Sequence, residues 1–255
     1  MNRIVQALAP FLLIGGLLIA WEIACRALAV PRYFLPPPSA IGQALATDWP
    51  ILLHSAWNTL AMALMALLVA SVLAQAVALL VALSPIADRA VRPLAVVLQV
   101  TPVVAIAPLV LIWAGLDHPG RAIIALAAVV AFFPIFSGAV TGLKSADRDL
   151  ERLFDLYGAS PLQRLGRLRL PSAVPFLLEG HKVAAGLAVI GAVVAEFVAG
   201  SGGAQGLAWR ILEASNRLQT AKMFAALFVL GVMGAVLHAA LEIAERAGLR
   251  WWRGR

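Results

Sequence analysis

The chain has 255 residues, of which 62% are hydrophobic and 13% are charged. Because soluble domains carry roughly a quarter charged residues, this composition excludes an ordinary soluble domain and predicts a protein that crosses a membrane several times. The net charge of +7 does not point to a nucleic-acid partner, since the Lys and Arg residues lie between the apolar segments and near the C-terminus, as in cytoplasmic loops. A single cysteine, Cys25, excludes an intrachain disulfide and a multi-cysteine metal site.

Six apolar segments are long enough to cross a bilayer, because a transmembrane helix needs about 20 residues. None shows the short alternating pattern of a transmembrane β-strand. We therefore predict an all-α polytopic membrane protein in which residues 1–255 form one transmembrane domain. The expected spans lie near residues 11–30, 57–84, 92–116, 121–143, 179–199 and 221–245.

The distribution of positive charge predicts the orientation. With the N-terminus inside, most of the 20 Lys and Arg residues lie on the inner side, as the positive-inside rule requires. Both termini and the loop over residues 144–178 are then cytoplasmic. The first segment could also be a signal peptide cleaved after Ala27-Leu28-Ala29. Glu22 and Arg26 favour an uncleaved helix, because they interrupt the apolar run and can pair four residues apart.

Residues 31–56 are more polar than the spans. Ser39 is a candidate cap for a short amphipathic helix on the outer face, and Pro50 is expected to separate that helix from the second span.

We find no sequence motif for catalysis. The chain has no G-x-x-x-x-G-K-[ST] phosphate loop and no pair of histidines or cysteines at metal-ligand spacing. His54, His118 and His181 are expected at solvated span ends, and His238 is expected to be a polar packing residue in the last span.

Polar groups inside the expected spans are candidates for the transport pathway, because such groups are costly in lipid. Glu196 lies in an apolar run and either lines a pathway or joins two helices through hydrogen bonds. A proton relay would need a second acidic residue or a lysine partner, and no neighbouring span centre offers one. Gln99 precedes Pro102 and Pro108, which each remove a backbone donor and bend the helix. That segment is either a pathway wall or a static kink.

The segment from Asp147 to Arg169 alternates charges with apolar residues at helical spacing and is interrupted at Gly158-Ala159-Ser160-Pro161. Ser160 can cap a second short helix that has Pro161 at its first position. We predict a helix–turn–helix that Pro171 and Pro175 separate from the fifth span. Such a segment either binds a soluble partner or lies on the membrane surface. A glycine at the break favours close approach of another chain.

Seven short motifs follow one another along residues 33–245: Phe34–Ser39, Pro102–Gly115, Phe133-Pro134, Gly142–Ser145, Gly158–Ser160 with Leu170-Pro171, Ala195-Glu196 and Gly200–Gly206. Taken together and in this order, they resemble the inner-membrane permeases of ABC importers, specifically the branch that handles nitrate, sulfonates and taurine. One departure is clear: the family's loop usually opens with Glu-Ala-Ala six residues before the glycine, whereas this chain has Arg152, Leu153 and Phe154 there, with Glu151 one place earlier.

The resemblance implies a permease subunit of the bacterial plasma (inner) membrane that is not itself an enzyme, with a cytoplasmic coupling helix between spans four and five. Its implied partners are an ATP-binding subunit in two copies, a periplasmic or extracellular solute-binding protein, and the lipid bilayer. A second permease subunit is also implied, either another copy of this chain, which gives a homodimer, or a paralogue. ATP and Mg²⁺ would be held by the ATPase, and no cofactor by this chain. The implied ATPase-coupling residues are Glu151, Phe154, Tyr157, Gly158, Ala159, Ser160, Leu170 and Pro171.

The implied substrate is a small molecule related to nitrate, sulfonates or taurine, or a heterocyclic vitamin precursor. A secondary transporter driven by an ion gradient remains the competing hypothesis.

Overall fold

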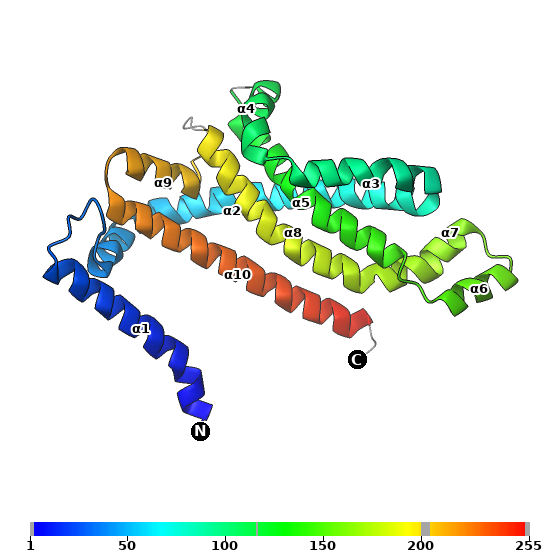
Figure 1. The fold of residues 1–255 in the computed structure, drawn as a ribbon, viewed down its shortest axis with the longest axis horizontal. Helices are drawn as coiled ribbons and strands as arrows, with labels where there is room; N and C mark the ends of the chain where they lie inside the picture. The colour runs from blue at the N-terminus through cyan, green and yellow to red at the C-terminus, as the bar shows by residue number, and fades with distance from the viewer. Residues whose placement is uncertain (1–2, 116, 200–204, 253–255) are drawn as a thin grey trace.

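The structure is a computed structural model that describes residues 3–115, 117–199 and 205–252. This part of the chain consists of helices and turns, as the apolar segments predict (Figure 1). In chain order the elements are α1 (Arg3–Ala27), α2 (Pro38–Leu83), α3 (Pro85–Val100), α4 (Val103–Ala114), α5 (Pro119–Leu143), α6 (Arg148–Leu156), α7 (Pro161–Arg164), the π-helical turn η1 (Leu165–Arg169), α8 (Leu170–Ala199), α9 (Leu207–Asn216) and α10 (Thr220–Trp252).

Four stretches of helix are long and apolar enough to cross a membrane: Pro38–Leu83, Pro119–Leu143, Pro161–Ala199 and Thr220–Arg250. The helices α3 and α4 add a fifth span if they are counted as one, although they are bent by 100° at their junction. An all-α polytopic membrane protein is therefore confirmed. The expected first span overlaps α1, and the total of six spans stays a prediction.

Small residues allow the central helices to pack closely. On α2, Ala63, Ala66 and Ala70 are buried at intervals of three and four residues, which places them on one face of the helix. The helices α5 and α8 cross at glycines: a β-carbon on Gly138 would lie 2.8 Å from the Phe176 carbonyl oxygen, and one on Gly180 would lie 2.9 Å from the Pro134 carbonyl oxygen. Without a hydrophobic driving force between helices in lipid, such close backbone approach is a main source of packing energy.

The start of α2 differs from the prediction. The helix continues through Pro50, so the separate amphipathic helix predicted before residue 57 does not exist. Ser39 does not act as a cap: its N–H and hydroxyl donate to the Glu22 carboxylate at 2.9 and 2.8 Å. Glu22 also pairs with Arg26 at 2.6 Å, as predicted. A carboxylate on α1 thus accepts from the first turn of α2, where negative charge is favoured.

The fifth span also begins differently from the prediction. Pro171 and Pro175 lie inside α8 and do not separate it from the preceding loop. The turn η1 explains why the helix survives Pro171, because the Leu170 N–H bonds to the Leu165 carbonyl oxygen, five residues back. Such wide turns occur as insertions in α-helices, and this one leaves the backbone helical from Pro161 to Ala199.

The two ends of the helix bundle are different in character (Figure 1). At one end lie the short helices α6 and α7, together with the end of α2 and the start of α3. The helix α9 and the start of α10 lie at the opposite end. Residues 200–204, which form most of the Gly200–Gly206 motif, lie outside the described residues.

Candidate functional site

The loop after α5 folds into an elbow made of α6, a tight turn and α7. Local capping builds both helices. The Asp147 side chain accepts the Asp149 N–H at 2.7 Å at the start of α6. At the start of α7, Ser160 Oγ accepts the Gln163 N–H at 3.3 Å, and Gln163 Oε1 accepts the Ser160 N–H at 2.8 Å. This reciprocal capping box confirms the predicted Ser160 cap.

The turn of the elbow depends on Gly158, which has a φ of +62°. The Gly158 N–H donates to the Asp155 carbonyl and the Ala159 N–H to the Phe154 carbonyl, each at 3.0 Å. This pair of bonds is a Schellman motif, which favours glycine in the left-handed conformation. A β-carbon on Gly158 would meet nothing within 4 Å. The glycine is therefore explained by its backbone conformation, and close approach of another chain stays a prediction.

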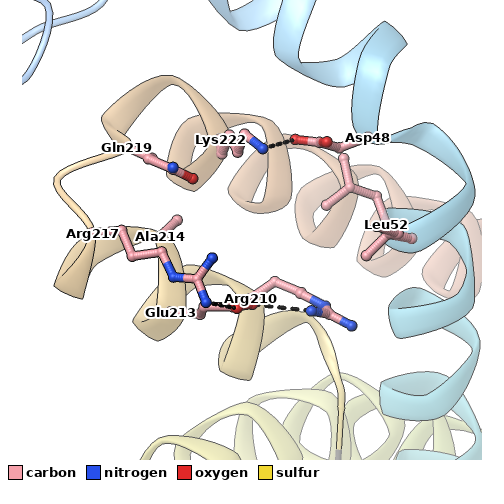
Figure 2. A pocket seen from close by; sticks show the side chains of 9 residues that line it. Asp48, Leu52, Arg210, Glu213, Ala214, Arg217, Gln219 and Lys222 are labelled. Atoms are coloured by element: carbon pink, nitrogen blue, oxygen red, sulfur yellow. Dashed lines mark hydrogen bonds and ion pairs between the residues drawn. The ribbon is translucent and has the colours of Figure 1, made fainter.

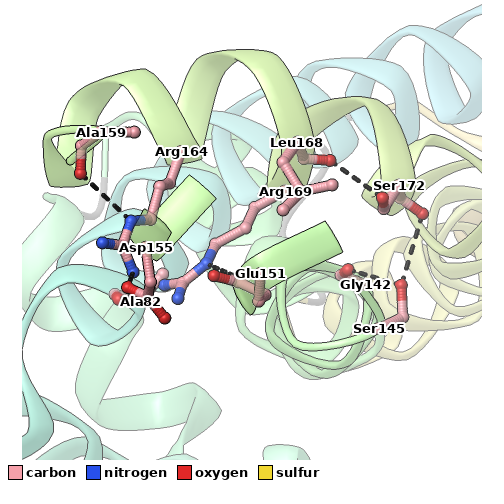
Figure 3. Close-up of polar contacts among 10 residues, drawn as sticks. All are labelled: Ala82, Gly142, Ser145, Glu151, Asp155, Ala159, Arg164, Leu168, Arg169 and Ser172. Carbon is pink, nitrogen blue, oxygen red and sulfur yellow. Dashed lines mark hydrogen bonds and ion pairs between the residues drawn. The ribbon is translucent and has the colours of Figure 1, made fainter. Parts of the chain in front are cut away.

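Ion pairs hold the elbow against the bundle (Figure 3). Arg169 donates from Nε to Glu151 Oε1 at 2.7 Å and from its terminal guanidinium to the Ala82 carbonyl at 3.4 Å. Arg164 pairs with Asp155 across the turn. Arg169 joins α6 to the base of α8 and to the last turn of α2, where unsatisfied carbonyls attract positive charge.

Three large apolar side chains of the elbow are exposed among charged residues such as Arg152 and Asp149. Leu156, Tyr157 and Leu162 are 85%, 83% and 70% exposed. Glu151 and Asp155, in contrast, are engaged by arginines of the same chain. Of the predicted coupling residues, those within Phe154–Ser160 lie at the tip of the elbow. Leu170 and Pro171 lie at its base, in the first turn of α8. An exposed apolar surface of this kind is typical of a site that another molecule covers.

The predicted pathway residues fall into two groups. Gln99 and Pro102 are exposed and flank the 100° bend between α3 and α4. The predicted bend is therefore present at Pro102, while α4 continues through the exposed Pro108. No hydrogen bond or ion pair links these three residues to Glu196 within residues 3–115, 117–199 and 205–252.

Glu196 is 2% exposed and lies where α8 meets α2 and α9. Its carboxylate accepts the Thr59 hydroxyl at 2.8 Å and the Ala208 N–H at 3.0 Å. The Thr59 oxygen in turn accepts the Leu207 N–H at 2.9 Å. Glu196 and Thr59 together satisfy the free N–H groups at the start of α9, a role that side chains commonly take at helix N-termini.

Sequence reasoning identifies Gln75 as a polar group that can hold helices together, but it misses that Ser71 and His181 form a polar cluster with Gln75 between α2 and α8. It placed His181 at a solvated span end, but Nε2 of His181 lies 2.8 Å from Ser71 Oγ on α2. Gln75 donates to the same Ser71 oxygen at 2.7 Å. His181 Nδ1 lies 2.7 Å from the Leu177 carbonyl, which can only accept, so Nδ1 carries a proton. The four-residue spacing of Ser71 and Gln75, which places both on one helix face, was the available signal.

A second unpredicted feature is a charged cavity of about 160 Å³ between α2, α9 and α10 (Figure 2). Lys222 pairs with Asp48 at 3.0 Å, and Glu213 pairs with both Arg210 and Arg217 at 3.0 Å. The Lys222–Asp48 pair joins α10 to α2, whereas both Glu213 pairs lie within α9 and its C-terminal cap. Arg210 also joins α9 to α2, because its Nε donates to Ser55 Oγ at 3.0 Å.

Comparison with known proteins places this geometry in context. Residues 66–247 match the family described as binding-protein-dependent transport system inner membrane component. The chain is 31% identical to a probable ABC transporter permease protein of Haemophilus influenzae, over 93% of this chain and 95% of that protein. It is 33% identical to the formylaminopyrimidine transport permease protein ThiX of Halalkalibacterium halodurans, over 98% of each chain. It is 28% identical to the putative aliphatic sulfonates transport permease protein SsuC of Escherichia coli, over 95% of this chain and 91% of that protein.

Proposed function

The chain belongs to the binding-protein-dependent transport system inner membrane components, and from its place in that family we propose how it works as the permease subunit of an ABC importer. Two copies of the chain form the membrane pathway. Two ATP-binding subunits hold ATP and Mg²⁺ and bind the two elbows. A solute-binding protein delivers the solute from outside. The chain itself moves the solute and hydrolyses no nucleotide.

One observation carries this proposal: the helical backbone runs without interruption from Pro161 in the elbow to Ala199 at the far end of the bundle. A displacement of the elbow is therefore passed to the fifth span by a stiff helix. The exposed Leu156 and Tyr157 at its tip provide the apolar contact for an ATPase. When ATP draws the two ATPases together, the elbows move with them, and the spans shift from an inward-open to an outward-open arrangement.

The orientation follows from the same assignment. The elbow and both termini lie in the cytoplasm, and the protein lies in the bacterial plasma membrane. The excess of Lys and Arg in the segments on that side supports this orientation. Charged cavity residues such as Arg217 and Lys222 then face outward, where the solute-binding protein docks.

The two groups of pathway candidates take different roles in this proposal. The bend at Pro102 and the exposed Gln99 form part of the pathway wall, because broken backbone at membrane depth is stable only against protein or a water-filled cavity. Glu196 anchors α9 and does not contact the solute, because its carboxylate is buried and its oxygens already accept hydrogen bonds.

The proposed solute is a small molecule of the sulfonate or taurine type, or a heterocyclic vitamin precursor. The relatives support both classes, since their printed names include aliphatic sulfonates, taurine, formylaminopyrimidine and riboflavin. Ligand binding to the purified solute-binding protein encoded next to this chain decides between them.

Reconstitution tests the function itself. The chain, its ATPase and its binding protein are purified together and inserted into liposomes that contain ATP. We expect solute uptake that requires the binding protein and is abolished by vanadate. Uptake by the chain alone, driven by an ion gradient, would support a secondary transporter; the comparisons support the importer and not that alternative.

A further inference from the structure

A cavity of about 510 Å³ lies between α3 and α5 at the elbow end of the bundle. Its size falls within the range of roughly 300–1,000 Å³ that is usual for small-molecule sites. Part of its wall is apolar: Val96 comes from α3, and Phe133 and Phe136 come from α5. None of the residues considered above for coupling or for the pathway lines it.

Two cationic residues, Arg92 and Lys144, also line this cavity, and Lys144 lies beyond Phe133 and Phe136 along α5. Both cationic residues pair with Asp88: Arg92 Nε lies 2.5 Å from one carboxylate oxygen and Lys144 Nζ lies 2.6 Å from the other. One carboxylate against two cations leaves one positive charge in excess. An arginine has five N–H donors and a lysine has three, so one bond each to Asp88 leaves most of these donors for a ligand.

Two hydroxyl groups lie along α5 between the phenylalanines and Lys144. Ser137 and Thr141 lie one turn apart on α5, and both line the cavity. A hydroxyl can donate and accept, so it suits the polar end of a ligand whose charge lies at Arg92 and Lys144. The cavity therefore changes from cationic through neutral polar to apolar.

We propose that this cavity binds an amphiphilic monoanion, with its anionic head group between Arg92 and Lys144 and its apolar body against Phe133 and Phe136. The single excess charge matches a single negative charge, and the apolar walls match a short alkyl or aromatic body. Two sources supply this chemistry: a transported organic anion, such as an alkyl sulfonate, or an anionic phospholipid of the surrounding membrane, for which basic pockets between helices are known sites. For the transported anion, the inference rests on the importer function proposed above.

Occupation of the cavity bears directly on the elbow. Lys144 is the C-terminal cap of α5, directly after Leu143, and the next residue, Ser145, donates from its hydroxyl to the Ser172 carbonyl of α8 at 3.4 Å. A head group held by Lys144 thus lies one residue from the contact that joins α5 to the base of the elbow.

The test uses the full chain assembled with its ATPase in nanodiscs of phosphatidylcholine, with radiolabelled 1-octanesulfonate as the probe and 1-octanol as its uncharged analogue. We expect saturable binding of the sulfonate, at least about tenfold tighter than that of the alcohol. The double variant Arg92→Gln and Lys144→Gln should weaken sulfonate binding about tenfold or more, which corresponds to at least about 1.4 kcal/mol. The matched control is Arg246→Gln, which removes one exposed arginine on α10 and should bind as the unchanged chain does.

Two further variants show whether a loss of binding reflects the cavity itself rather than misfolding, and a displacement experiment identifies which of the two ligands occupies it. Lys144→Arg keeps the charge and should retain binding within about threefold, whereas Val96→Trp fills the cavity and should abolish it. Displacement of the probe by phosphatidylglycerol in the disc assigns the site to lipid; displacement only by solute-loaded binding protein with ATP assigns it to the transported anion. Equal binding of sulfonate and alcohol, or unchanged binding in the double variant, would overturn the inference. If the cavity inference is overturned in this way but uptake remains sensitive to vanadate, the proposed importer function is still supported.

Discussion

Glu196 and Gly206 are in such close contact that a β-carbon on the glycine would lie 2.1 Å from Glu196 Oε1. Gly206 immediately precedes α9, and the carboxylate occupies the space where any other side chain would begin. The glycine therefore allows the Glu196 carboxylate to reach the Ala208 N–H at 3.0 Å. The local backbone does not require glycine, because φ at this residue is −84°.

The substitution Gly206→Ala should displace the Glu196 carboxylate and separate α9 from α8. Loss of buried hydrogen bonds to a carboxylate costs about 1.5–3 kcal/mol, so we expect a lower Tm of the detergent-solubilised protein and reduced uptake. Gly231→Ala on α10 is the control, because a β-carbon there meets nothing within 4 Å. Equal Tm values for the two variants would contradict the close contact.

Substitution of Glu196 distinguishes an anchor from a pathway residue. Glu196→Gln keeps the volume and one acceptor oxygen, so uptake should be retained while the Tm falls slightly. Glu196→Ala leaves Thr59 and the Ala208 N–H without their partner and should lower the Tm by the larger amount. Uptake and Tm are measured on the same preparations. If Glu196→Gln abolished uptake at an unchanged Tm, Glu196 would line the pathway.

Local signals in the sequence were sufficient for the elbow and for most of the spans. The Ser160-Pro161 start of α7 depends on residues within one turn, and the spans depend on apolar composition over about 20 residues. The bend at Pro102 likewise follows from a missing backbone donor. These features depend on neighbours in sequence, so a single chain reveals them.

The remaining features depend on contacts between distant residues. Thr59 and Glu196 are 137 residues apart, and no local pattern predicts that they meet or that α9 starts there. The effects of two prolines were also misjudged, since α2 continues through Pro50 and the turn η1 keeps the backbone helical at Pro171. The Arg92–Asp88–Lys144 group was missed for the same reason, since Asp88 and Lys144 are 56 residues apart.

The glycine crossing of α5 and α8 predicts a strong effect of one methyl group. Gly138→Ala should place its β-carbon 2.8 Å from the Phe176 carbonyl oxygen, which is backbone and cannot move without shifting α8. Overpacking of this kind typically costs about 1–3 kcal/mol. Thermal unfolding followed by circular dichroism measures it. Gly186→Ala, on an open part of α8, should be neutral or slightly stabilising; a loss as large as that of Gly138→Ala would argue against this crossing.

The Arg169–Glu151 pair should matter for coupling more than for folding. Because both side chains are partly exposed, 32% and 23%, the pair contributes no more than about 1 kcal/mol to stability. The variants Arg169→Glu and Glu151→Arg should each lower the ATPase activity that the solute-loaded binding protein stimulates, by about fivefold. The double variant restores opposite charges and should recover part of that activity.

The exposed pair Arg152 and Asp149 provides the control for this experiment, because it is 77% and 86% exposed and lies within α6 alone. Exchanging these two residues should leave stimulated ATPase activity unchanged. A double variant of Arg169 and Glu151 no better than either single variant would show that the pair does not position the elbow.

The effect of a substitution at Gly158 should depend on whether the new residue tolerates the left-handed backbone conformation, and not on the size of its side chain. The φ of +62° at Gly158 costs an ordinary L-residue roughly 1–2 kcal/mol, whereas asparagine tolerates the left-handed region. Gly158→Val should therefore distort the tip of the elbow and uncouple ATP hydrolysis from uptake, while the protein still inserts into the membrane. Gly158→Asn should keep the backbone conformation. If Gly158→Asn also uncouples the two activities, the space above the glycine is filled by the ATPase; if Gly158→Val transports normally, the tip of the elbow is not the docking site.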